Sequence, residues 1–246
     1  FVIRPPSTVL RVEKSDATDP VDFGNLLRDE ILGTGFTIPA GPGADAAFVG
    51  GVDATDGTFT SAGIFTGGLA SIGIESGIVL ATGEATTAAG PNTSNASSGN
   101  ASLAGDADLD TEFFPLEPAA RKTRDATSLQ FQVQAGFDGA AYFNFVFASE
   151  EYNELVRTTS QADALAVFVT DLTAGGTARN VALIPGTTLP VSRTTVNGGN
   201  PFGTGATRPL LYNNNDLREG GAYLRELGYD GFTDVFTAQF NVVDGH

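Results

Sequence analysis

The sequence predicts a mostly β fold, an antiparallel β-sandwich of the jelly-roll kind with one short helix near the N-terminus. Three observations lead to this: apolar and polar residues alternate in several short segments, 31 Gly and 12 Pro interrupt the chain, and only one segment has helical spacing. Short strands with few helices between them are typical of sandwiches. A chain of 246 residues with 41% hydrophobic residues fits one large domain. We therefore expect an N-terminal arm over residues 1–18 and a single sandwich domain over residues 19–246.

The arm contains one alternating segment, and the predicted helix follows it. Between Ser7 and Lys14, Val9, Arg11 and Glu13 alternate with Leu10 and Val12, which predicts an exposed strand. Asp19 is a favourable N-cap, Pro20 suits the first helical turn, and Gly33 is a terminator, so the helix is expected between them. No other segment is predicted to be helical.

The remaining strands follow from short apolar or alternating runs. Residues 143–147 place a Phe at every second position, and residues 129–133 alternate in the same way, so these two strands are expected to pair across the turn at residues 136–139. Residues 86–110 are polar without an apolar period, which indicates a long loop. Further strands are expected at residues 78–82, 164–170, 181–184 and 236–242.

The composition argues against an enzyme. The chain has no Cys, which excludes thiolate metal sites, disulfides and Cys nucleophiles. Its single His is the terminal His246, and a Ser-His-Asp triad needs a firmly positioned base, so this residue argues against such a triad. The neighbouring carboxylates Glu150 and Glu151 keep a carbohydrate-active enzyme open as an alternative. Adjacent strand residues point to opposite faces, however, and the chain has no Trp for sugar subsites.

The net charge of −16 favours cations as partners. It opposes binding to nucleic acid and to anionic membranes, both of which attract Lys and Arg. No apolar run approaches the roughly 18 residues of a membrane helix, so we expect no direct membrane insertion. The chain begins at Phe1 without an initiator Met, which fits a removed signal peptide and a secreted protein.

Three N-glycosylation sequons lie in one polar stretch, which reads as an exposed loop of an extracellular protein. The candidate glycosylation sites are Asn92, Asn95 and Asn100.

The most distinctive segment is a Phe-rich strand that runs directly into acidic residues between Phe145 and Glu154. Asp163 precedes the next apolar strand, so the two strand ends can bring Glu150, Glu151 and Asp163 together. Calcium takes six to eight oxygen ligands from such loops. The sequence therefore predicts a Ca²⁺ site here, with solvated turn residues as the alternative.

Seven segments in order resemble the choice-of-anchor L domain of bacterial and archaeal surface proteins. They are residues 77–83, 90–92, 105–109, 147–154, 163–164, 180–187 and 231–233. The resemblance implies a secreted, modular β domain without catalytic activity. It maps the family's acidic motif onto Glu150, Glu151 and Asp163, and it adds Asp106 and Asp108 as further metal candidates. In the family, another apolar strand usually follows the position of His246.

Two functions follow as hypotheses. In the first, the chain is a non-catalytic subunit that polymerises head-to-tail with copies of itself into a surface filament or sheath, stabilised by calcium. The donor strand would be Val9, Leu10, Arg11 and Val12, filling the place of the family's last strand in a neighbouring copy. An arm that folds back onto its own sheet is the alternative for this segment. In the second hypothesis, the chain is a calcium-binding adhesion or ligand-binding domain of a larger anchored cell-surface protein.

Overall fold

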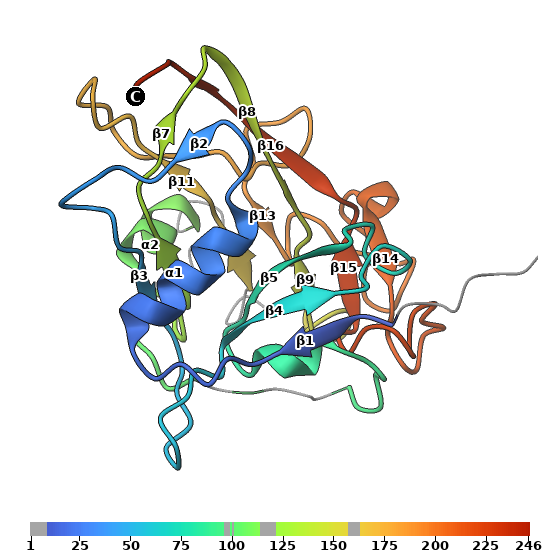
Figure 1. The fold of residues 1–246 in the computed structure, drawn as a ribbon. Helices are drawn as coiled ribbons and strands as arrows, with labels where there is room; N and C mark the ends of the chain where they lie inside the picture. The colour runs from blue at the N-terminus through green and yellow to red at the C-terminus, as the bar shows by residue number, and fades with distance from the viewer. Residues whose placement is uncertain (1–8, 96–98, 100, 114–121, 157–162) are drawn as a thin grey trace, which may run out of the picture.

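The computed structural model describes residues 9–95, 99, 101–113, 122–156 and 163–246. Within them the chain forms sixteen short strands, two α-helices and two 3-10 helices, and every strand pairing is antiparallel. The prediction of a mostly β fold is confirmed. The strands form seven small sheets (Figure 1).

The N-terminal arm lies in a sheet of its own chain. Strand β1 (Arg11–Glu13) pairs with β4 (Ala62–Thr66), which pairs with β5 (Ser76–Leu80). Leu10 is only 3% exposed because it packs with Phe65 and Phe232. The donor-strand residues thus occupy the alternative position, folded back onto their own sheet, whereas Ser7 lies outside the described residues.

Helix α1 (Pro20–Ile31) has the predicted bounds for local chemical reasons. The Asp19 side chain accepts hydrogen bonds from the backbone N–H groups of Val21 and Asp22, which caps the first turn. The buried face of α1 packs Phe23 against Phe48 and Phe59, with both ring centroid distances at 4.9 Å. Capping and an apolar stripe therefore specify the same helix.

A second helix, α2 (Ala107–Phe113), begins inside the segment at residues 86–110 that was predicted to be a long loop and extends beyond it. The prediction of a single helix is wrong. The Asp106 carboxylate caps α2, because its Oδ1 accepts from the backbone N–H groups of Asp108 and Leu109, both at 2.9 Å. A 3-10 turn, η1 (Ala85–Ala88), shortens the predicted loop further.

The longest pairing joins β8 (Gly139–Phe145) to β16 (Phe236–Val242), visible in Figure 1 as two long neighbouring ribbons. The expected pairing between residues 129–133 and 143–147 is wrong. Strand β6 (Ser128–Gln130) pairs with β3 (Ala47–Val49) instead. Phe145 is buried against Phe236 of β16, so a contact distant in sequence outweighed the local hairpin.

The other sheets are short. Strand β2 (Phe36–Thr37) pairs with β7 (Gln134–Ala135), β10 (Ala164–Leu165) with β13 (Val191–Ser192), and β11 (Phe168–Val169) with β12 (Arg179–Asn180). The last sheet has the order β14 (Tyr212–Asn214), β15 (Gly231–Thr233) and β9 (Ala148–Ser149), and the 3-10 turn η2 (Pro209–Leu211) leads into β14.

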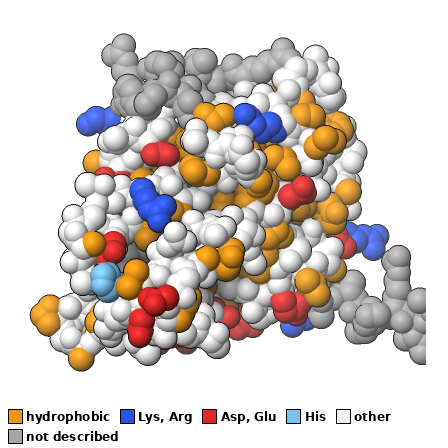
Figure 2. All heavy atoms as spheres, turned by 90° about the horizontal axis from the view of Figure 1, so that it is seen from above, with side chains coloured by type: hydrophobic (Ala, Val, Ile, Leu, Met, Phe, Trp, Pro, Cys, Tyr) orange, Lys and Arg blue, Asp and Glu red, His pale blue; other side chains and the backbone are white. Residues whose placement is uncertain are grey.

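On the face that Figure 2 shows, the acidic side chains do not form a continuous patch. There, acidic side chains appear as separate spots among apolar and neutral ones. Several of the most buried polar side chains are acidic or amide groups instead, among them Asp216, Asp230, Asn153 and Asn215. Within the described part of the chain, no helix has the length and apolar character needed to cross a membrane.

Candidate metal centre

The sheet β14-β15-β9 brings three distant chain segments to one edge. Gly231 at the start of β15 pairs with Ser149 at the end of β9 and with Asn214 at the end of β14. Because both pairings are antiparallel, the residues that follow β9, follow β14 and precede β15 meet at that edge. This geometry brings together acidic side chains that lie far apart in the sequence and belong to no common motif.

Three carboxylates meet beyond this edge: Glu154, Asp216 and Asp230. One oxygen from each lies within 4.8 Å of the others. Ligands of one Ca²⁺ ion at 2.3–2.6 Å lie at most about 5 Å apart, so the spacing fits a shared ion. Asp216 and Asp230 are 1% and 0% exposed, whereas Glu154 is exposed, so one side of the centre is open to solvent.

Asp230 carries an unsatisfied oxygen. Its Oδ1 accepts a hydrogen bond of 2.7 Å from Nδ2 of Asn92, but its buried Oδ2 has no hydrogen-bond partner among the described residues. Burial, together with the charges of Glu150, Asp216 and Glu154, raises the pKa of Asp230 to about 8, although the Asn92 bond lowers it. A buried carboxylate in this environment is costly unless a cation balances it.

The neighbouring loop holds Asp216 in place. Its Oδ1 accepts from the backbone N–H groups of Arg218 and Glu219 at 2.6 and 2.9 Å, which forms a tight Asx turn. The preceding Asn215 is fully buried and bonds through its side chain to the backbone of Tyr223, Leu227 and Tyr229. The position of the Asp216 carboxylate is therefore fixed by the fold.

Two of the predicted sequon residues belong to this centre. Asn92 is 3% exposed, and its Nδ2 also donates to the carbonyl of Asn215. Nδ2 of Asn95 donates to Glu154 Oε1 at 2.9 Å and to Asp216 Oδ2 at 3.2 Å. Since Nδ2 is the atom that carries an N-linked sugar, this arrangement disfavours glycosylation of the folded chain at both residues. Asn100 lies outside the described residues.

The carboxylates predicted as the calcium site face an arginine. Arg193 is 0% exposed, and its Nε lies 3.2 Å from Glu151 Oε2, at ion-pair distance but without the alignment of a hydrogen bond. Burial and the charge of Asp163 raise the pKa of Glu151 to about 7, although Arg193 lowers it. Asp163 also accepts a 2.6 Å bond from Ser149 Oγ. The structure thus brings Glu151 and Asp163 together as the sequence suggested, and a guanidinium supplies the positive charge.

The other predicted ligands lie apart from one another. Glu150 lies close enough to the three-carboxylate centre for its charge to raise the pKa of Asp230. Asp106 serves as the cap of α2, and Asp108 is exposed in the first turn of that helix.

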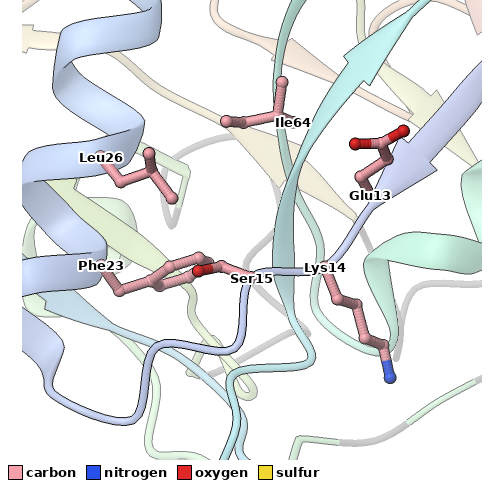
Figure 3. A pocket seen from close by; sticks show the side chains of 6 residues that line it. All are labelled: Glu13, Lys14, Ser15, Phe23, Leu26 and Ile64. Carbon is pink, nitrogen blue, oxygen red and sulfur yellow. The ribbon is translucent and has the colours of Figure 1, made fainter.

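A surface hollow of about 170 Å³ lies elsewhere, between α1, β1 and β4 (Figure 3). Phe23 and Leu26 line one side and Glu13 and Lys14 the other. The Lys14 ammonium points away from the apolar side chains and pairs with Glu84 at 2.8 Å. The hollow is smaller than a ligand pocket of about 300 Å³ and lacks converging polar groups.

Asp216 and Asp230 were absent from the sequence-based prediction. Their only local signals are the Asn213-Asn-Asn-Asp216 run and the Asp230-Gly231 pair, both of which read as ordinary turns. The register of β14, β15 and β9 makes them neighbours of Glu154, and that register is not visible in a single sequence.

Comparison with known proteins supports the family resemblance. No curated protein and no solved structure matches the chain. The family model of the Choice-of-anchor L domain matches residues 43–246, a range that includes all three carboxylates of the centre. The chain therefore belongs to the choice-of-anchor L domain family.

Proposed function

We propose that this chain is a non-catalytic, calcium-binding module of an extracellular surface protein. In this proposal Glu154, Asp216 and Asp230 hold one Ca²⁺ ion, which fastens together the three segments that meet beside β9, β14 and β15. The observation that carries the proposal is the fully buried Oδ2 of Asp230, which has no hydrogen-bond partner among the described residues and lies in a group of three carboxylates.

Family membership supports an extracellular location and a non-catalytic function for this chain. Choice-of-anchor domains are extracellular, surface-associated domains that are not known as enzymes. Extracellular calcium modules work with dissociation constants of roughly 10⁻⁴–10⁻³ M, so a site with three carboxylates and one open side suits that setting.

The donor set favours calcium over other metals. All three groups are carboxylates, and the chain has no Cys for a soft metal. The single His, His246, lies elsewhere, 3.5 Å from Asp171. Magnesium requires near-ideal octahedral geometry at short distances, whereas Ca²⁺ tolerates an irregular set of oxygens from separate loops.

Calorimetric titration and thermal unfolding of the domain test this proposal. Ca²⁺ should bind to one site and raise the melting temperature, and Mg²⁺ should do so far less. Asp230→Asn should abolish both effects and raise the melting temperature of the calcium-free protein, because it removes a buried charge while keeping the acceptor for Asn92. Asp234→Asn is the matched control, since Asp234 is exposed and also accepts from an asparagine, Asn213. Absence of calcium binding at millimolar concentrations would contradict the proposal.

Self-assembly into a filament is a second candidate function, and the β8–β16 sheet favours it. Among the described strands, β8 and β16 pair only with each other, so their outer edges have no strand partner. Such edges accept added strands. A donor segment at residues 9–12 would have to leave β4 and withdraw Leu10 from its core position.

Electron microscopy and light scattering of the intact chain and of a variant without residues 1–14 test the filament. The intact chain should form filaments. The shortened chain loses strand β1 and the buried Leu10, so it should be less stable, and it should stay monomeric under conditions where circular dichroism shows it folded. Filaments that persist in a folded shortened chain, or an intact chain that remains monomeric at high concentration, would exclude strand exchange by this arm.

A further inference from the structure

Asn95 makes hydrogen bonds that are unusual for an amide beside a cation site. Its Nδ2 donates to two of the three proposed ligands, Glu154 and Asp216, while its own Oδ1 is buried without a hydrogen-bond partner among the described residues. The amide therefore presents its positive end to the carboxylates and leaves a buried carbonyl oxygen unsatisfied. Each unsatisfied buried polar atom requires an explanation.

A half-turn of this amide would exchange its two ends. Oxygen and nitrogen of an amide have nearly the same size, so the turn leaves the packing unchanged and reverses the polarity that faces the carboxylates. Facing two carboxylates alone, the nitrogen is favoured, because it donates to both. Facing a cation held between them, the oxygen is favoured, because amide oxygens are common Ca²⁺ ligands.

We propose that Asn95 is a further calcium ligand, and that its amide turns to present Oδ1 when the ion binds between Glu154, Asp216 and Asp230. This inference rests on the proposed function. It means that the ion fastens a fourth segment, residues 92–95, to the centre, in addition to the segments of Glu154, Asp216 and Asp230. Asn92 anchors the same segment through Asp230 and the Asn215 carbonyl.

The opposite role for Asn95 is that of a competitor. If Nδ2 only takes the place of the ion, removal of the amide would free the carboxylates, and calcium would bind more tightly. If Oδ1 is a ligand, removal of the amide weakens binding. The two roles therefore predict changes of opposite sign in the calcium affinity.

Calorimetric titration with CaCl₂ decides between the two roles, using the intact chain, Asn95→Ala, Asn95→Asp and the control Asn213→Ala. Asn95→Ala should weaken calcium binding by about tenfold or more. Asn95→Asp adds a fourth carboxylate, so it should bind calcium at least as tightly as the intact chain. Without calcium, the same carboxylate should lower the melting temperature. Asn213→Ala removes an exposed asparagine–carboxylate bond and should bind as the intact chain does.

The outcomes separate this inference from the function on which it rests. An intact chain that does not bind calcium overturns the proposed function. An intact chain that binds calcium, with equal or tighter binding by a folded Asn95→Ala variant, overturns the role of Asn95 alone. If Asn95→Ala does not fold, weak binding by Asn95→Asp relative to the intact chain overturns it instead. A calcium-bound crystal structure with Oδ1 of Asn95 about 2.4 Å from the ion would support it directly.

Discussion

Two groups of carboxylates lie beside strand β9 and differ in what balances their charge. Glu151 and Asp163 adjoin the buried Arg193. Glu154, Asp216 and Asp230 form the second group, and none of them forms an ion pair with Lys or Arg among the residues that the structure describes. Both groups face the same cost of burying negative charge. In the first group the cation is Arg193, a residue of the chain itself. The second group is suited to a cation that binds from the solvent.

This difference shows how far an acidic motif can predict a metal site. The contiguous run at Glu150 and Glu151 resembles a calcium loop, yet Glu151 pairs with a guanidinium 42 residues further along the chain, at Arg193. The group assembled from scattered residues is the one without an internal cation.

Replacing Arg193, the internal cation, should have the largest effect on the free energy of unfolding. Arg193→Leu leaves the half-buried Glu151 and Asp163 without their guanidinium, and loss of one partner of a buried ion pair costs about 3–5 kcal/mol of unfolding free energy. Urea denaturation measures the loss. The double variant Arg193→Leu with Glu151→Leu should recover much of it, because no uncompensated glutamate remains. An Arg193→Leu protein as stable as the parent would show that the guanidinium does not balance this group.

Removing the external cation should have the next largest effect. At a calcium concentration about 100 times the dissociation constant, a site that binds only the folded state adds about 2.7 kcal/mol to the free energy of unfolding. Addition of EDTA should remove that amount and lower the melting temperature. Arg193→Leu should keep its sensitivity to EDTA, because the two groups have separate cations. If Arg193→Leu were no longer sensitive to EDTA, calcium binding by the second carboxylate group would depend on the Arg193 ion pair of the first.

The calcium-free protein should lose stability as the pH rises from about 4.5 to about 7. In the folded state burial and Asp163 raise the pKa of Glu151 to about 7 from an ordinary value of 4.5. Above 4.5 the unfolded chain ionises this group more readily, so the unfolded state is stabilised relative to the folded state until the folded pKa is passed. Glu151 should contribute on the order of 2 kcal/mol to this loss, and Asp230, whose pKa burial raises to about 8, should add to it; urea denaturation across this pH range measures the total. In Glu151→Gln the slope should be smaller, and an unchanged slope would assign the titration to another group.

Removing the Ser149 hydroxyl, which makes two hydrogen bonds, should have the smallest effect. Ser149 Oγ donates to Asp163 Oδ2 at 2.6 Å and accepts from the backbone N–H of Glu151 at 3.0 Å. Ser149→Ala should therefore cost about 1–2 kcal/mol of unfolding free energy without changing calcium affinity. Calorimetry of the variant checks the second point. A large loss of calcium affinity would mean that the Arg193 group positions the ligands of the other.

Local features of the fold were predictable from the sequence, and those set by distant contacts were not. Helix α1 was predictable because Asp19 and Pro20 define its start within a few residues. Helix α2 is only seven residues long, too short to show an apolar period, so its cap at Asp106 read as an acidic loop. Strand β8 was recognised from its alternating Phe residues, but its partner β16 lies about 90 residues away in the chain.

The candidate site divides in the same way. The acidic run that contains Glu151 and Glu154 was visible as a motif, and Asp163 was recognised as its neighbour. Arg193, Asp216 and Asp230 were not, because their proximity depends on strand pairings that join remote segments. The asparagines were read as sequons, since a single sequence does not show that a polar loop turns inward.

The hydrogen bond from Asn92 to Asp230 spans 138 residues. Contacts of such sequence separation form late in folding, after much of the entropy of chain closure has been lost. An ion held there would contribute little to the transition state, so it should leave the folding rate nearly unchanged and slow unfolding instead. For a protein exposed outside the cell, resistance to proteases and to forced unfolding is governed in part by that unfolding rate. The location of the centre would then matter for how long a folded copy lasts rather than for how quickly it forms.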